Sequence, residues 1–207
     1  MAGLEAISWR ESVVNYIRSE AQPADKFGHQ PRLYALSVRI AQDLPGECDD
    51  DVLFAAAWMH DLGVFLGHRP ADPEKLAGWD HVPYTIGRTV ELLRGWEFPE
   101  EKLERVAETI RTHQAKDEAA IVEAIVLRDA DILEQLGAIG ALRTVVKVGR
   151  DTRYQSYSAV VPVLRRAVDM LPSQVRLPTS RVLAEERAET LRNLLEAVEK
   201  EAGELLF

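Results

Sequence analysis

The sequence predicts an all-α fold, and three observations support it. Apolar residues recur at helical spacing along most of the chain. No pair of alternating apolar segments is joined by an Asn-Gly or Asp-Gly turn, the strongest short-range signal of a β-hairpin. Prolines and glycines fall where helices begin and end. We therefore expect a bundle of helices.

Each helix is bounded by a local signal or by the limits of its apolar pattern. Pro83 and Pro99 stand in first turns, which tolerate a missing N–H, and Gly95 and Gly203 fall just beyond helix ends. The acidic run 49–51 indicates a solvated loop or a helix start. We expect helices at about 4–19, 30–43, 50–65, 83–93, 99–112, 118–135, 138–148, 159–171 and 180–202.

Two irregular stretches are candidates for substrate contacts. The segment 67–82 is long for a connection in a helical domain, and its glycines and prolines favour a lid or binding loop. The segment 149–158 carries side chains that are able to reach a phosphate or ribose, although such residues are also common in packing. These side chains are Arg150, Arg153, Tyr154 and Tyr157.

Composition excludes several classes of protein. A chain of 207 residues with 46% hydrophobic residues is expected to form one domain, 1–207. Its net charge of -9 argues against a general nucleic-acid surface, whereas a small anionic substrate fits beside a bound metal. The single cysteine, Cys48, favours a reducing compartment. No leader and no apolar run of membrane-spanning length is visible, so we expect a cytoplasmic protein without membrane contact.

The most informative motif is His60-Asp61, at the end of an apolar run. A neutral imidazole and a carboxylate side by side suit a divalent cation. Because neighbouring side chains on a helix point about 100° apart, other helices must supply further ligands. The candidates are His29, His81, His113 and Asp131. We expect His68 to be a surface residue or at most a substrate contact.

This set resembles the HD superfamily of metal-dependent phosphohydrolases, whose pattern is a histidine, then His-Asp, then a distant aspartate. His29, His60-Asp61 and Asp131 match the pattern, and the segment 129–140 is similar to the one that closes the site in small bacterial HD hydrolases. The resemblance covers about 29–143 and, more loosely, 179–201. It implies an HD-type bundle with a metal site between the central helices, on which C-terminal helices at about 159–202 pack.

The resemblance also implies a ligand set for one or two divalent ions. His29, His60 and Asp131 would hold one ion, His81 and His113 a second, and Asp61 would bridge them. With a single ion, His81 and His113 would act as acids or electrophiles on the substrate side. Either arrangement supports attack by a metal-activated water on a nucleotide or another small phosphorylated metabolite. Mn, Fe, Zn, Co, Ni and Mg all remain open.

Further residues are expected to assist, and two other functions stay open. Basic side chains that could neutralise phosphoryl charge are Arg69, Lys75, Arg88, Arg111 and Arg128. Asp129 is expected to orient a ligand histidine or an arginine. The alternatives are a di-iron oxygenase of HD type, or a regulatory module that binds a nucleotide or metal without turnover. The apolar stripe of the last helix is expected to be core, with a homodimer seam as the alternative.

Overall fold

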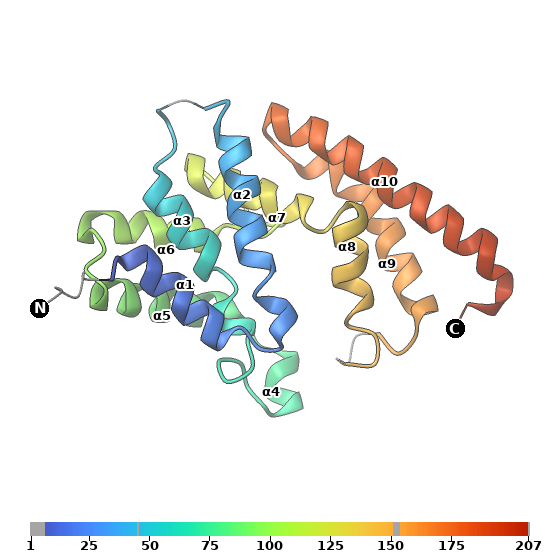
Figure 1. Ribbon diagram of the computed structural model, residues 1–207, viewed down its shortest axis with the longest axis horizontal. Coiled ribbons are helices and arrows are strands. Elements are labelled where there is room, and N and C mark those ends of the chain that lie inside the picture. Colours follow the sequence, from blue (N-terminus) through green and yellow to red (C-terminus); the bar gives the residue numbers. More distant parts are fainter. Residues whose placement is uncertain (1–6, 45, 151–153, 207) are drawn as a thin grey trace, which may run out of the picture. The chain divides into compact units, whose positions relative to one another are not determined.

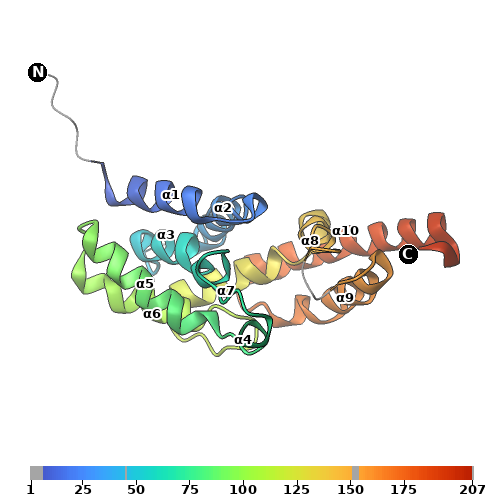
Figure 2. The same ribbon diagram turned by 90° about the horizontal axis from the view of Figure 1, so that it is seen from below.

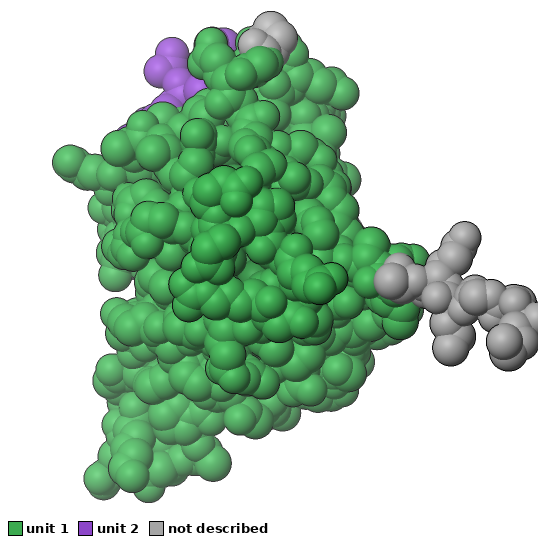
Figure 3. Space-filling view, turned by 90° about the vertical axis from the view of Figure 1, so that its left-hand side faces the viewer, with its two compact units in different colours: residues 1–127 green, residues 128–207 purple. Residues whose placement is uncertain are grey.

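The computed structural model describes residues 7–44, 46–150 and 154–206. Every regular element within these ranges is a helix, which confirms the predicted all-α class. The chain divides into two compact units, Met1–Leu127 and Arg128–Phe207, which Figure 3 distinguishes by colour. The boundary falls inside α7 (Val122–Leu133). The expectation of one domain with C-terminal helices packed on its core stays a prediction.

Unit 1 is organised around a short central helix. It contains α1 (Trp9–Glu20), α2 (His29–Ala41), α3 (Asp50–Met59), α4 (Pro73–Ala77), α5 (His81–Gly95) and α6 (Leu103–Arg111), followed by the start of α7. Eight consecutive residues of α3, from Val52 to Met59, are buried. Helices α1, α2 and α6 pack against α3, and α5 packs against α6 (Figures 1 and 2).

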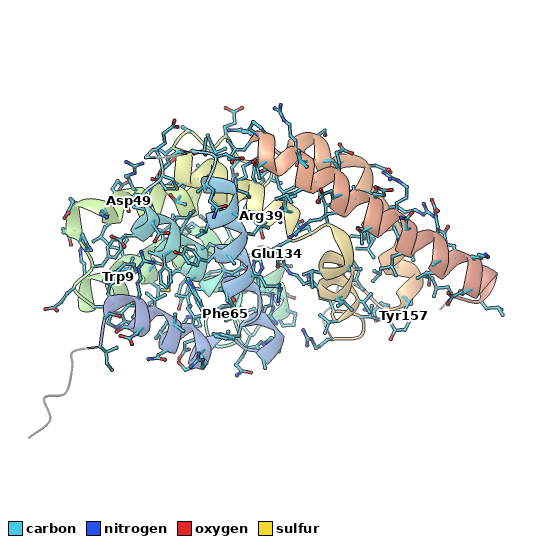
Figure 4. The ribbon with its side chains drawn as sticks, turned by 45° about the horizontal axis from the view of Figure 1, so that its top comes forward. Trp9, Arg39, Asp49, Phe65, Glu134 and Tyr157 are labelled. Carbon is cyan, nitrogen blue, oxygen red and sulfur yellow. The ribbon has the colours of Figure 1, made fainter. Side chains whose placement is uncertain are left out.

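Charged residues fix the start of α3. The carboxylate of Asp49 accepts the backbone N–H groups of Asp51 at 3.0 Å and Val52 at 3.3 Å, which caps the helix. Arg10 and Lys102 then pair with Asp51 from two other segments. The acidic run is therefore a helix start, with Asp49 labelled in Figure 4.

Unit 2 contains the end of α7 together with α8 (Gly137–Val145), α9 (Tyr157–Met170) and the long α10 (Pro178–Ala202). Helix α10 packs against both α8 and α9 (Figures 1 and 2). Leu183, Leu191 and Leu195 are buried, whereas Leu194 is 40% exposed. The apolar stripe of the last helix therefore serves mainly as core.

Several predicted boundaries were wrong. The helix expected at 50–65 ends at Met59, and a separate 3₁₀ turn follows at Leu62–Val64. In this turn the Gly63 N–H donates to Thr85 Oγ1 at 3.0 Å, so it makes no helical bond to a carbonyl four residues earlier. The segment 67–82 contains α4, which was not predicted. The helix expected at 118–135 begins at Val122, and the one expected at 99–112 opens with a 3₁₀ turn.

Two predictions reach residues outside the described part of the chain. Residues 4–6 of the first predicted helix and Arg153 of the second irregular stretch fall there. Of the other residues singled out in that stretch, Tyr157 opens α9 and is 51% exposed, and the carbonyl of Tyr154 accepts the Gly149 N–H. Within the described ranges, no helix is both long and apolar enough to cross a membrane.

Candidate metal centre

Four of the histidines in unit 1 lie at helix ends. His29 and His81 are the first residues of α2 and α5, His60 directly follows α3, and His113 lies two residues beyond α6. His29, His60 and His113 are at most 4% exposed, and the side chain of His81 is 17% exposed. The packing of α2 and α6 against α3, and of α5 against α6, thus brings together imidazoles that are far apart in sequence.

These imidazoles gather around Asp61. The Asp61 Oδ1 atom lies 3.7 Å from His60 Nε2 and 3.9 Å from His81 Nε2. His60, Asp61 and His113 each offer one ligand atom within 4.8 Å of the others. Ring centroids are 5.2 Å apart for His29 and His60, and 5.0 Å apart for His60 and His113. Two atoms bound about 2.1 Å from one ion lie at most about 4.2 Å apart, so small side-chain movements bring this set to coordination distance.

The backbone sets which ring nitrogens are available. His60 Nδ1 lies 3.0 Å from the Ala57 carbonyl, and His113 Nδ1 lies 2.6 Å from the Ile110 carbonyl. A carbonyl only accepts, so Nδ1 carries the proton in both rings and the neutral ring keeps its lone pair on Nε2. A backbone partner on the other ring nitrogen is the usual support of a metal-binding histidine. The residues therefore fit a divalent ion.

The charge of Asp61 agrees with this fit. Burial alone would raise the pKa of this carboxyl, but positive charge on His60 and His29 outweighs it and lowers the pKa well below its usual range. Asp61 is therefore a carboxylate, and positive charge beside it stabilises this form. A bound cation would provide that charge with the imidazoles neutral.

Gly63 allows α5 to approach the His60-Asp61 turn. A Cβ atom on Gly63 would lie 2.8 Å from Thr85 Oγ1 and 2.9 Å from the carbonyl oxygen of His81. Hydrogen bonds hold this contact on both sides, because the Gly63 N–H donates to Thr85 Oγ1 and Trp79 Nε1 donates to the Gly63 carbonyl at 2.9 Å. The absence of a side chain at residue 63 therefore determines how close His81 comes to Asp61.

The remaining predicted ligand, Asp131, lies on α7 in unit 2. The Nε2 of Gln135, one turn further along, is 3.2 Å from its carbonyl and 3.4 Å from its Oδ2. Its role as a ligand stays a prediction from the sequence pattern.

Asp129 and Arg128 have structural contacts in unit 2. Both carboxylate oxygens of the buried Asp129 accept backbone N–H groups from the segment that leads into α10, those of Arg176 at 2.9 Å and 3.1 Å and of Leu177 at 2.9 Å. Arg128 Nη1 donates to the Gln174 carbonyl at 2.8 Å and lies 3.6 Å from Asp129. These bonds connect Asp129 to the backbone just before α10. Its expected role in orienting a ligand histidine or an arginine stays a prediction.

The other predicted basic residues are dispersed over unit 1. Arg88 pairs with Glu91 at 2.8 Å, and Lys75 is exposed on α4. Arg69 is half-buried in the loop after the His60-Asp61 turn. Arg111, which pairs with Glu108, lines a groove of about 550 Å³ between the start of α5 and the segment after α6. The groove is lined by Asp80, Val82, Pro83, Ile86, Gly87, Arg111, Gln114, Lys116 and Asp117.

His68 is not the surface residue that was expected. Its side chain is 7% exposed, with Nδ1 2.8 Å from the Tyr84 hydroxyl and Nε2 3.0 Å from Glu20 Oε2. The partners lie 16 and 48 residues away. No local sequence signal marks this contact, because it depends on how α1 and α5 meet.

An all-α fold in which buried histidines surround a His-Asp pair defines a histidine–aspartate metal centre. The chain belongs to the HD domain family, whose pattern its residues 27–136 match. This membership confirms the family suggested by the sequence and supports a divalent metal site in general.

Solved structures share the fold over nearly the whole chain. The crystal structure of Bacillus subtilis YpgQ has a TM-score of 0.72 at 21% identity, covering 95% of this chain and 97% of that one. YpgQ in complex with ADP gives 0.67 at 24% identity, with coverage of 95% and 99%. A predicted HD superfamily hydrolase from an uncultured Thermotogales bacterium gives 0.65 at 21% identity, with 97% of both chains covered. No curated protein matches the chain in sequence.

Proposed function

We propose that this protein is a metal-dependent phosphohydrolase that acts on a nucleotide or another small phosphorylated metabolite. The observation that carries the proposal is the cluster of His60, Asp61 and His113, in which both imidazoles are buried. Two backbone carbonyls keep the proton of each ring on Nδ1, which leaves the Nε2 lone pair to bind an ion. Membership in the HD family supports the same chemistry.

The substrate class is supported by a relative and by charge. YpgQ, which shares this fold, binds ADP in one of its crystal structures. A nucleoside diphosphate carries the phosphoryl oxygens that a divalent cation and nearby basic residues neutralise. Arg111 and Lys116 in the groove beside the start of α5 are the basic residues that we assign to the substrate.

In this proposal, which follows the family pattern, His29, His60 and Asp131 would hold one ion, His81 and His113 would hold a second, and Asp61 would contribute to both. A divalent ion held there supplies positive charge for the phosphoryl oxygens and a water of lowered pKa. The carbonyls of Ala57 and Ile110 hold the His60 and His113 rings in one tautomer. His29, His60 and His113 are buried, and Asp61 keeps its negative charge at neutral pH.

The test is phosphate release by protein purified without a chelating column. We expect Mn-, Co- or Ni-loaded wild type to release phosphate from nucleotides, and Asp61→Ala to lose at least about 100-fold in rate together with most of its bound metal. Asp169→Asn, an exposed acid on α9, serves as the matched control and should behave as wild type. Full activity of metal-free wild type would refute the proposal.

The four clustered histidines also keep the oxygenase alternative open, because di-iron sites use the same kinds of ligand. Iron in the purified protein with substrate-dependent O₂ uptake and no phosphate release would favour it. A regulatory module would instead bind ADP with unchanged affinity in Asp61→Ala while a broad phosphatase screen stayed blank.

A further inference from the structure

We propose that His68 and Tyr84 are positioning residues that hold the metal ligand His81 in place through α5. This inference rests on the proposed role of His81 in binding an ion. It starts from the polar contact of His68 with Glu20 and Tyr84, which none of the functions assigned above requires. We call these three residues the clamp.

The hydrogen bond between His68 and Glu20 has a defined direction. A carboxylate accepts, so His68 Nε2 carries a proton and donates it to Glu20, the last residue of α1. In the neutral ring Nδ1 is then an acceptor, and the Tyr84 hydroxyl donates to it at 2.8 Å. The imidazole is largely buried, so either bond leaves an unsatisfied polar group if its partner is removed.

The clamp acts on the segment that carries the His60-Asp61 pair. His68 closes the short loop after the 3₁₀ turn, where its backbone N–H donates to Phe65, a fully buried residue labelled in Figure 4. In the same loop, the Leu66 N–H donates to the Gln22 carbonyl just after α1. The loop is thus bound to the end of α1, and the hydrogen bond between His68 and Tyr84 connects the same loop to α5.

On α5, Tyr84 stands one turn after His81 and next to Thr85. The Trp79 ring lies against Tyr84 at a centroid distance of 5.8 Å, and its Nε1 donates to the Gly63 carbonyl. Three separate hydrogen bonds therefore hold the segment 79–85, which includes the first turn of α5: from Gly63 to Thr85, from Trp79 to Gly63 and from Tyr84 to His68. The third continues through His68 to the partly exposed Glu20 at the end of α1.

The experiment measures metal binding directly. The Tyr84→Phe variant, which loses only the hydroxyl, is freed of metal with a chelator and titrated with Mn²⁺ by calorimetry. The matched control is Tyr157→Phe, at an exposed tyrosine of α9. We expect Tyr84→Phe and His68→Leu to weaken Mn²⁺ binding by about 10-fold or more, as loss of an orienting partner does. His68→Gln, which keeps a donor and an acceptor, should recover part of the affinity.

A merely structural clamp gives a different result. In that case Tyr84→Phe would lower the thermal midpoint and leave the Mn²⁺ isotherm unchanged, which would overturn the proposal. Metal binding is read without substrate, so the outcome is independent of phosphate release. A weakened isotherm in a protein that hydrolyses nothing would support the clamp and reject the proposed function.

Discussion

Replacing Gly63 with alanine should damage both the stability and the metal centre. The added methyl group would lie 2.8 Å from Thr85 Oγ1, 2.9 Å from the His81 carbonyl oxygen and 3.0 Å from His81 Cβ. Unbonded heavy atoms normally sit about 3.5 Å apart, so the start of α5 must retreat by roughly 0.5 Å. The movement increases the distance from His81 Nε2 to Asp61 Oδ1, which is already 3.9 Å.

The energetic cost follows from two contributions. Overpacking of a tight contact costs about 1 to 3 kcal/mol, and loss of the Gly63–Thr85 hydrogen bond adds about 1 kcal/mol. A total of about 2 to 4 kcal/mol lowers the thermal midpoint of a chain of this size by roughly 5 to 15 °C. We expect the Mn²⁺ affinity of the folded variant to fall by about 10-fold.

Gly87→Ala provides the control on the same helix. A Cβ at residue 87 meets no atom within 4 Å, so alanine there should stabilise α5 by about 0.5 to 1 kcal/mol. Urea unfolding monitored by circular dichroism and Mn²⁺ titration are measured for both variants. If Gly63→Ala is as stable as Gly87→Ala and binds Mn²⁺ as tightly as wild type, the argument from close approach is refuted.

Two further predictions concern the parts that support the site. Asp129→Ala leaves the backbone N–H groups of Arg176 and Leu177 without this acceptor, so the free energy of unfolding measured in urea should fall by about 2 to 4 kcal/mol. The Mn²⁺ affinity of the folded protein should not change. A selective loss of metal binding would instead support a role of Asp129 in orienting a metal ligand. Hydrogen bonds from Arg10 and then Lys102 lower the pKa of Asp51 below its usual value of 3.8. Its contribution to stability is complete above that value and lost as the pH falls through the folded-state pKa, so Asp51→Asn should flatten the acid side of the stability curve between about pH 5 and 2. Parallel curves for the variant and the wild type would contradict this assignment.

Local sequence signals predicted most of the helices, because apolar spacing and caps act within a few residues. The limits of α3 show where such signals end. The apolar run through Phe65 favours a longer helix, but α3 ends at Met59, and in the turn that follows the Gly63 N–H donates to Thr85, 22 residues away. A contact between residues so far apart in the sequence cannot be predicted from apolar spacing or capping residues.

The candidate site was predicted in a similar way. His60, Asp61, His81 and His113 were chosen by residue type and order, and the structure brings them together in unit 1. His68 was assigned to the surface because it matched no motif, although its burial depends on partners from α1 and α5. Asp129 accepts the backbone N–H groups of Arg176 and Leu177, contacts that no local pattern predicts, and its expected orienting role stays a prediction.

The position of the histidines at helix termini has a consequence for how this protein can diverge. A residue inserted near the C-terminal end of α5, beside Gly95, lengthens the helix by about 1.5 Å. It does not change the orientation of His81, because only the residues after the insertion are rotated about the helix axis. The same holds for α2 beyond His29. Length variation at the outer ends therefore leaves the coordination angles intact, whereas a single deletion between Ala57 and Asp61 would rotate a ligand by about 100° and dismantle the centre.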